Sequence, residues 1–332
     1  MNKRAVQTSI SLLAAILFIW LALRTVDPAE LWQVMKSVTF YWLPFFIPVL
    51  VFSHYLRAER WKLFLPDPER KVLRSTLFAG VMLGYLVNYL VPRLGELSRP
   101  VYVARKNGLS PGKLIGTIVA ERLFDLFVLL LLLAAAFLYY AGQPGTLDAL
   151  FGIAEWSWYH YAIIPAVIAA GIGALLLFRR LLIQAEKKGN IKSPLLSKLM
   201  DAGLSFSDGL VSMKKVKSWP MFIVLTAGIW SGYVLMTFIP FFMLDLQMEY
   251  GLTLFDAVIL TVASSVGVTI PTPAGIGSYH LVMQQTMYLL FDVPPSSGLT
   301  YATVLHIVNF LVILMIAPLS LWWDKYYTLV RD

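Results

Sequence analysis

Long apolar stretches separated by short polar ones run through the whole chain. Each of six stretches comes close to, or exceeds, the roughly 20 residues that a helix needs to cross a bilayer. They are about 5–23, 40–57, 114–140, 159–178, 219–244 and 300–323. Two further apolar regions, about 75–106 and 254–291, are each interrupted near the middle by Pro and Gly. The pattern predicts an all-α polytopic membrane protein with about six transmembrane helices and eight or more apolar segments.

The apolar halves of the two interrupted regions are short for full spans. As helices, residues 77–91 and 254–270 would be roughly 22 and 25 Å long at 1.5 Å per residue. A bilayer has a hydrocarbon core of about 30 Å. We therefore expect two re-entrant hairpins of broken helices. Tilt or local thinning of the bilayer would also allow complete spans, and that alternative stays open.

The composition supports a membrane protein and excludes any site that requires cysteine. The chain has 332 residues, of which 58% are hydrophobic and 14% charged, whereas a soluble domain is about 25% charged. It contains no cysteine, which excludes disulfides, thiolate metal ligands and a cysteine nucleophile. We expect a single integral membrane domain over residues 1–332, with no cofactor and no metal site.

The lysines and arginines gather on one side of the predicted topology. They precede the first span, follow the second span and the first interrupted region, fill the segment 180–218 and close the chain, while Arg24 and Lys36 fall on the other side. This asymmetry predicts that both termini are cytoplasmic. Residues 180–218 are expected to form a cytoplasmic loop at an anionic lipid surface, or simply a solvated loop. Because the basic residues follow the predicted topology, the net charge of +8 does not indicate a nucleic-acid partner.

The two parts of the chain resemble each other. When Pro92 is aligned with Pro273, a short apolar helix ends at a proline and small residues follow in both parts. With Pro111 on Pro295, Arg122 meets His306 and Asp125 meets Asn309. The halves, about 1–141 and 159–325, each contain three crossings. Because three is odd, the second half would be inverted, as in many secondary transporters.

Polar chemistry gathers at these breaks. A helix that starts after a break directs unpaired N–H groups and a positive dipole end into the site, which suits a phosphate. Arginine adds a planar fork of donors that fits phosphate oxygens. The breaks themselves are formed by Pro92, Pro271 and Pro273. The candidate substrate-binding residues are Asn88, Arg93, Gly95, Glu96, Arg99, Glu121, Arg122, Asp125, Gly275, Gly277, His280, His306 and Asn309. The alternative is that the arginines and carboxylates among them pair only to hold helices together.

Three motifs in order resemble the lysylphosphatidylglycerol synthase transmembrane family, also called flippase-like. They are Asn88-x-x-x-Pro92-x-x-Gly95-Glu96-x-x-Arg99, Glu121-Arg122-x-x-Asp125 and Pro271-Thr-Pro273-Ala-Gly275-Ile-Gly277. The resemblance covers roughly residues 5–325. It implies a bacterial or archaeal inner-membrane protein that moves a lipid between leaflets.

The best-known members of this family act on aminoacylated phosphatidylglycerol and carry a soluble aminoacyltransferase domain. Only a short tail follows residue 325 here, so synthase activity is not expected. The family pattern usually closes its last motif with Glu, where this chain has His280. That difference argues against recognition of a cationic headgroup at this position.

The favoured hypothesis is a flippase or transporter for a lipid with an anionic or phosphate headgroup. Arg93, Arg99 and Arg122 would bind the phosphate, and the neighbouring carboxylates would pair with them, with proton exchange left open. One alternative is an intramembrane enzyme for a lipid-phosphate substrate, with Glu96 or Glu121 as general base. Another is an accessory scaffold. The lipid, the direction of movement, the energy source and the oligomeric state stay open.

Overall fold

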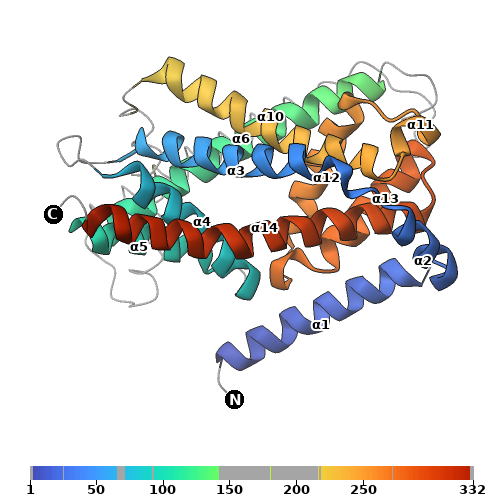
Figure 1. Cartoon of the computed structure of the whole chain (residues 1–332), viewed down its shortest axis with the longest axis horizontal. Coiled ribbons are helices and arrows are strands. Elements are labelled where there is room, and N and C mark those ends of the chain that lie inside the picture. The colour runs from blue at the N-terminus through green and yellow to red at the C-terminus, as the bar shows by residue number, and fades with distance from the viewer. Residues whose placement is uncertain are drawn as a thin grey trace. The chain divides into compact units, whose positions relative to one another are not determined.

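The computed structural model describes residues 3–24, 26–65, 72–91, 93–141, 180, 216, 218–270 and 272–329. Within these ranges every regular element is a helix (Figure 1). The chain divides into two compact units, one of Met1–Pro111 with Ser218–Asp332 and the other of Gly112–Lys217, and each is described by itself. The second unit is described mainly through α6 (Pro111–Ala141). The helices of the first unit are α1 (Lys3–Leu23), α2 (Pro28–Ser37), η1 (Phe40–Trp42), α3 (Leu43–Lys62), α4 (Arg74–Leu90), α5 (Gly95–Asn107), α10 (Trp219–Met243), α11 (Leu246–Tyr250), α12 (Leu254–Thr269), η3 (Pro273–Gly275), α13 (Ser278–Phe291) and α14 (Pro295–Leu329).

The expectation of an all-helical membrane protein is confirmed in its coarse form. In the described part of the chain, α10 and the segment Pro295–Tyr327 of α14 are long and apolar enough to cross a membrane. The pair Pro28–Ser37 and Phe40–Lys62, bent by 47°, is a third candidate. The predicted span 159–178 and most of the loop 180–218 lie outside the described residues. The number of six spans therefore stays a prediction.

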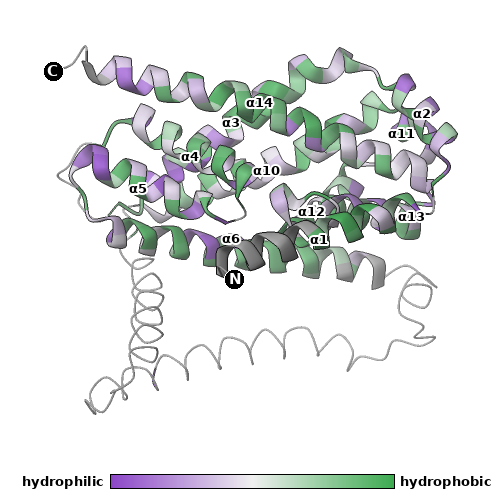
Figure 2. Cartoon of the chain, turned by 90° about the horizontal axis from the view of Figure 1, so that it is seen from below, coloured by the Kyte–Doolittle hydropathy of each residue, from purple (hydrophilic) through white to green (hydrophobic). Residues whose placement is uncertain are grey.

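Apolar side chains also cover outward faces of the spanning helices. Figure 2 shows apolar residues along α10, α12 and much of α14, and hydrophilic residues in α2 and α5. Leu314, Met315 and Leu319 of α14 are exposed, as are Ile223 and Val224 of α10. Apolar patches of this kind mark a surface that meets lipid or another protein. For a chain of this composition the simplest partner is the acyl region of a bilayer.

Each interrupted apolar region folds into a hairpin of two short helices. In the first, a Cβ added to Gly84 would lie 3.1 Å from the Gly95 carbonyl oxygen, so α4 and α5 touch through their backbones. In the second, a Cβ added to Gly267 would lie 2.9 Å from Tyr279 Cα, which brings α12 and α13 equally close. The four helices have 17, 13, 16 and 14 residues, hence lengths of roughly 20–26 Å. All four are shorter than a hydrocarbon core of about 30 Å.

The tips of both hairpins lie beside the middle of α14. The α4 helix starts near the C-terminal end of α14, where Thr76 bonds to Asp324 at 2.7 Å, and ends with the Tyr89 ring 5.0 Å from that of Phe310. The α13 helix starts with the His280 ring 5.1 Å from that of His306 and then runs toward Pro295. The two hairpins thus approach from opposite ends of α14. Their re-entrance into a membrane and the inverted repeat stay predictions.

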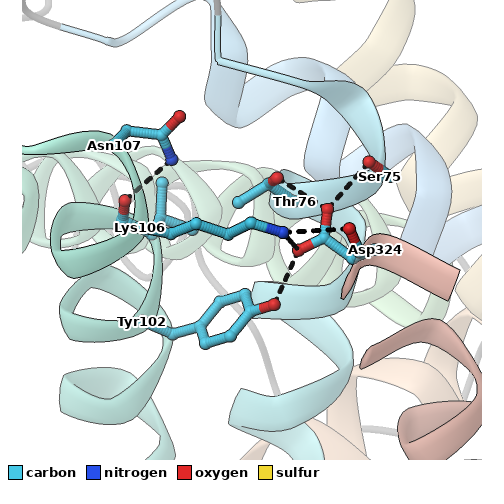
Figure 3. A network of polar contacts seen from close by, with 7 residues as sticks. Ser75, Thr76, Tyr102, Lys106, Asn107 and Asp324 are labelled. Atoms are coloured by element: carbon cyan, nitrogen blue, oxygen red, sulfur yellow. Dashed lines mark hydrogen bonds and ion pairs between the residues drawn. The ribbon is translucent and has the colours of Figure 1, made fainter. Parts of the chain in front are cut away.

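A buried carboxylate fixes the first hairpin to the end of α14 (Figure 3). Asp324 is fully buried and accepts hydrogen bonds from Ser75, Thr76, Tyr102 and Lys106 at 2.6–2.8 Å. A buried charge is tolerated only when it is paired and hydrogen-bonded, and these four donors meet that requirement. Lys106, which the sequence pattern used only as a cytoplasmic charge, is therefore a structural partner of α14.

The first helix packs on the second hairpin. Gln284 of α13 donates from Nε2 to the Ala22 carbonyl oxygen at 2.9 Å. A Cβ added to Gly277 would lie 2.6 Å from the Ala15 carbonyl oxygen, so α1 passes directly over the break between α12 and α13. Gly277 has φ 84°, a conformation that glycine adopts at little cost. Close packing and backbone conformation both require glycine at this predicted site residue.

Candidate functional site

The turn between α4 and α5 is closed by two predicted site residues. Asn88 accepts a hydrogen bond at Oδ1 from the Gly95 backbone N–H at 2.7 Å. A Cβ on Gly95 would lie 2.6 Å from the same Oδ1. These two residues therefore shape the break rather than extend into open space. Pro92 lies outside the described residues.

The turn between α12 and α13 is held by a serine that the sequence analysis did not single out. The buried Ser278 Oγ lies 2.9 Å from Thr272 Oγ1 and bonds to the Gly267 carbonyl oxygen at 2.9 Å and to the Gly275 carbonyl oxygen at 3.2 Å. Gly275 has φ 74°. The break thus satisfies its irregular backbone internally, as membrane depth requires. Pro273 begins η3, and Pro271 lies outside the described residues.

The two breaks face each other and are joined by Arg93. Its Nη2 donates to the carbonyl oxygen of Thr269 at 3.2 Å, at the end of α12. That carbonyl lies at the negative end of the α12 dipole, where a cation is stabilising. Arg93 is exposed and has φ 64°, a left-handed conformation that is unfavourable for a side chain of this size.

Both returning helices begin at these tips. The α5 helix starts at Gly95, and α13 starts at Ser278. Each start places the positive end of a helix dipole at its tip. The first-turn N–H groups of α5 already donate to Asn88 Oδ1 and to the carbonyl oxygens of Arg93 and Leu94. Glu96 stands in the first turn of α5 and is half-buried, whereas no acidic residue occupies the first turn of α13. The first tip, with Arg93 and Glu96, is therefore the charged one.

Arg99 lies deeper than its place in the motif suggested. It is 4% exposed, and its guanidinium carbon lies 4.1 Å from the centroid of the fully buried Trp61 ring on α3. The geometry is that of a cation–π contact. The structure thus places Arg99 between α5 and α3, and it leaves Arg93 as the arginine at the tip itself.

Two more arginines of α3 are buried in the same unit, although the sequence analysis used them only as cytoplasmic charges. Arg57 donates from Nη1 to the hydroxyls of Tyr233 at 2.6 Å and Tyr85 at 2.9 Å. Arg60 is fully buried and donates to Thr226 Oγ1 at 3.3 Å. Both lie on the helix faces that α10 covers. Their place at the end of a long apolar run fits a position at the membrane surface equally well, so it does not by itself indicate burial.

The second motif lies on α6. Glu121 is buried, whereas Arg122 and Asp125 are partly exposed, with 4.0 Å between Arg122 Nη1 and Asp125 Oδ2. Arg122 and Asp125 thus form a long ion pair three residues apart on the same helix. Because α6 belongs to the second unit, these three residues are placed only within their own helix.

A cavity of about 220 Å³ borders both tips. Tyr89 from the end of α4 and Ala274 from the second break contribute to its wall, and α10, α12, α13 and α14 provide the rest. His306 and Asn309 line it, so two predicted residues meet here. The His280 ring lies beside that of His306, with ring centroids 5.1 Å apart and the ring planes tilted by 48°. Among the described residues, no group of three or more His, Cys, Asp or Glu side chains could hold a metal ion.

Comparison with known proteins identifies the family of the chain. The family model described as the lysylphosphatidylglycerol synthase TM region matches residues 8–317. No curated protein and no solved structure gives a match. The matched range contains both hairpins, the α6 motif and the cavity. The chain therefore belongs to the lysylphosphatidylglycerol synthase transmembrane-region family.

Proposed function

We propose that this membrane protein is a transporter that moves a phosphate-bearing lipid between the two leaflets. The observation that carries the proposal is the convergence of two helix starts and Arg93 beside the middle of α14. His306 and Phe310, which meet the tips, are central in the span Pro295–Tyr327. At 1.5 Å per residue, His306 stands about 16 and 32 Å, and Phe310 about 22 and 26 Å, from the two ends of that span, so both lie near its middle.

The chemistry of the tips suits a phosphate. Backbone N–H groups at a helix start bind anions, and the helix dipole favours negative charge there. Arg93 is exposed and supplies a guanidinium group. Its hydrogen bond to Thr269 uses one donor, whereas a guanidinium has five. A phosphate can therefore bind beside this contact without breaking it.

The rest of the lipid requires no enclosed site. Exposed apolar side chains on α10 and α14 give the acyl chains a surface that continues into the bilayer, so only the headgroup passes between the tips. In this proposal the hairpins are re-entrant, the two halves are inverted repeats and both termini are cytoplasmic. The protein acts in a prokaryotic inner membrane as a transporter rather than as an enzyme.

Transfer of lipid by the purified full chain in vesicles tests the proposal. A phospholipid labelled on one acyl chain is placed in both leaflets, and the loss of protected label after a membrane-impermeant quencher is added gives the rate. We expect faster transfer than in vesicles without protein, and a large loss of that excess in Arg93→Ala. Equal rates with and without protein contradict the proposal. Chemical conversion of the labelled lipid would instead support the enzymatic alternative.

A further inference from the structure

The cavity beside the two tips has a chemistry that differs from that of the tips. Nine of its thirteen lining residues carry a hydroxyl, imidazole or amide group, and none of these thirteen described residues is Asp, Glu, Lys or Arg. An unpaired ammonium group is costly to bury where no carboxylate accompanies it. A purely apolar ligand would leave the polar groups of the wall without partners. The lining therefore suits a neutral group that forms hydrogen bonds.

The polar groups from α12 and α14 act mainly as acceptors. Ser264 and Ser265 donate their hydroxyl protons to the Thr261 carbonyl oxygen at 2.8 and 2.9 Å. Asn309 donates from Nδ2 to the Leu305 carbonyl oxygen at 2.7 Å. Once these protons are bound to helix carbonyls, the side-chain oxygens retain their lone pairs for a ligand. Hydroxyl groups of a ligand are the natural donors to these acceptors, whereas phosphate oxygens offer them no proton.

The size of the cavity limits what part of a lipid enters it. Its volume is about 220 Å³, below the roughly 300–1,000 Å³ typical of sites for complete drug-sized ligands. It is nevertheless many times the roughly 10–15 Å³ that holds one water molecule. A glycerol group or a single sugar ring is the kind of fragment that this space accepts. Since Tyr89 and Ala274 belong to the cavity wall, such a fragment would lie next to a phosphate bound at the tips.

We infer that the cavity binds the uncharged, hydroxyl-bearing part of the headgroup, so that the protein selects phospholipids with a polyol headgroup over those with an ammonium group. This inference rests on the proposed function. It divides recognition between two places: the phosphate contacts Arg93 and the helix starts, and the polyol enters the cavity. His306 and Asn309, which the sequence analysis proposed as site residues, belong to the polyol part.

The test compares three acyl-labelled lipids in vesicles that contain the full chain. Phosphatidylglycerol and phosphatidylpropanol carry the same charge and differ in the two hydroxyls, whereas phosphatidylethanolamine carries an ammonium group. We expect phosphatidylglycerol to move about tenfold faster than either, since each hydrogen bond contributes about 0.5–1.5 kcal/mol. In Ser264→Ala/Ser265→Ala the ratio of the phosphatidylglycerol rate to the phosphatidylpropanol rate should fall toward one.

A matched control is Ser320→Ala. Ser320 is a buried serine of α14 that bonds to the Ala317 carbonyl oxygen at 2.8 Å and does not line the cavity. It should leave the preference unchanged. Equal rates for the three lipids, all slowed by Arg93→Ala, would overturn the inference and leave the transport proposal intact. A preference that survives Ser264→Ala/Ser265→Ala in a protein that melts like the native chain would also overturn it. No transfer of any lipid would contradict the transport proposal and this inference together.

Discussion

Arg93 and Thr269 stand 176 residues apart in the sequence, yet the Arg93 guanidinium donates to the Thr269 carbonyl oxygen at 3.2 Å. This contact joins the tip of the first hairpin to the end of α12 in the second. It makes the charged break and the uncharged break parts of one site. Arg93 maintains the contact from a left-handed backbone conformation with φ 64°. Strain of this kind is often found at functional positions.

Two replacements of Arg93 should differ in stability but not in lipid transfer. Arg93→Gly relieves a left-handed conformation that costs an ordinary residue about 1–2 kcal/mol, so it should be more stable than Arg93→Ala by about 1 kcal/mol. Both variants should lose lipid transfer to the same extent, because both lack the guanidinium. Thermal unfolding in detergent and the vesicle assay measure the two effects. Arg105→Ala, an exposed arginine of α5, is the control; a loss of transfer as large as that of Arg93→Ala would refute a special role for the tip.

The first break should not tolerate a side chain at Gly95. A Cβ there would clash with the Gly84 carbonyl oxygen and with Asn88 Oδ1. The first belongs to the backbone of α4 and the second is held by its hydrogen bond from the Gly95 N–H, so neither can move without a loss of stability. We expect Gly95→Ala to destabilise the protein by about 2–4 kcal/mol, in the range of severe overpacking. Gly80→Ala meets the methyl group of Val103 at 2.9 Å, a side chain that can shift. The loss of stability in Gly80→Ala should be clearly smaller, and equal losses would argue against close packing at the tip.

Trp61 should contribute to stability through Arg99. The Arg99 guanidinium carbon lies 4.1 Å from the centroid of the Trp61 ring, and both side chains are buried. Trp61→Leu removes the ring face and should cost about 3–5 kcal/mol, from lost packing together with a cation–π contact of about 2 kcal/mol. A double-mutant cycle with Arg99→Met and thermal unfolding isolates the contact. Coupling below about 0.5 kcal/mol would show that the two side chains are only neighbours.

The Asp324 network should be structural. Asp324→Ala removes the carboxylate that accepts from the half-buried Tyr102 and Lys106 and leaves Lys106 only the backbone carbonyl of residue 324. Loss of one partner from a fully buried pair costs about 3–5 kcal/mol, which is the upper bound here. Glu59→Ala removes the Arg74 pair at 2.9 Å, in which Arg74 is 64% exposed, and an exposed pair contributes about 0–1 kcal/mol. The midpoints of unfolding should differ accordingly. Transfer by the Asp324→Ala protein that remains folded should keep the native headgroup preference, and a changed preference would place this network in the site.

The sequence predicted local structure well because local signals determine it. The helix starts near Gly95 and Ser278 follow from Pro and Gly after apolar runs, and the contact between Arg122 and Asp125 follows from helical spacing. Each of these predictions uses residues that are close together in the chain.

Contacts between segments that are far apart in the chain could not be predicted from the sequence pattern. A basic residue at the end of an apolar run can extend to the membrane surface or be buried against a neighbouring helix, so the burial of Arg57 was not predictable. Ser264 and Ser265 resemble the small residues of any packed membrane helix. Their place in a cavity depends on where α10 and α14 lie.

The central claim is that a phospholipid is held by its phosphate where Arg93 meets the end of α12. Mass spectrometry of the lipids retained by gently purified protein tests it most directly, with Arg93→Ala compared against the native chain and Arg105→Ala. The account predicts that the native chain and Arg105→Ala retain phosphate-bearing lipid and that Arg93→Ala loses most of it. Retention of the same lipids in the same amount by Arg93→Ala would contradict the account.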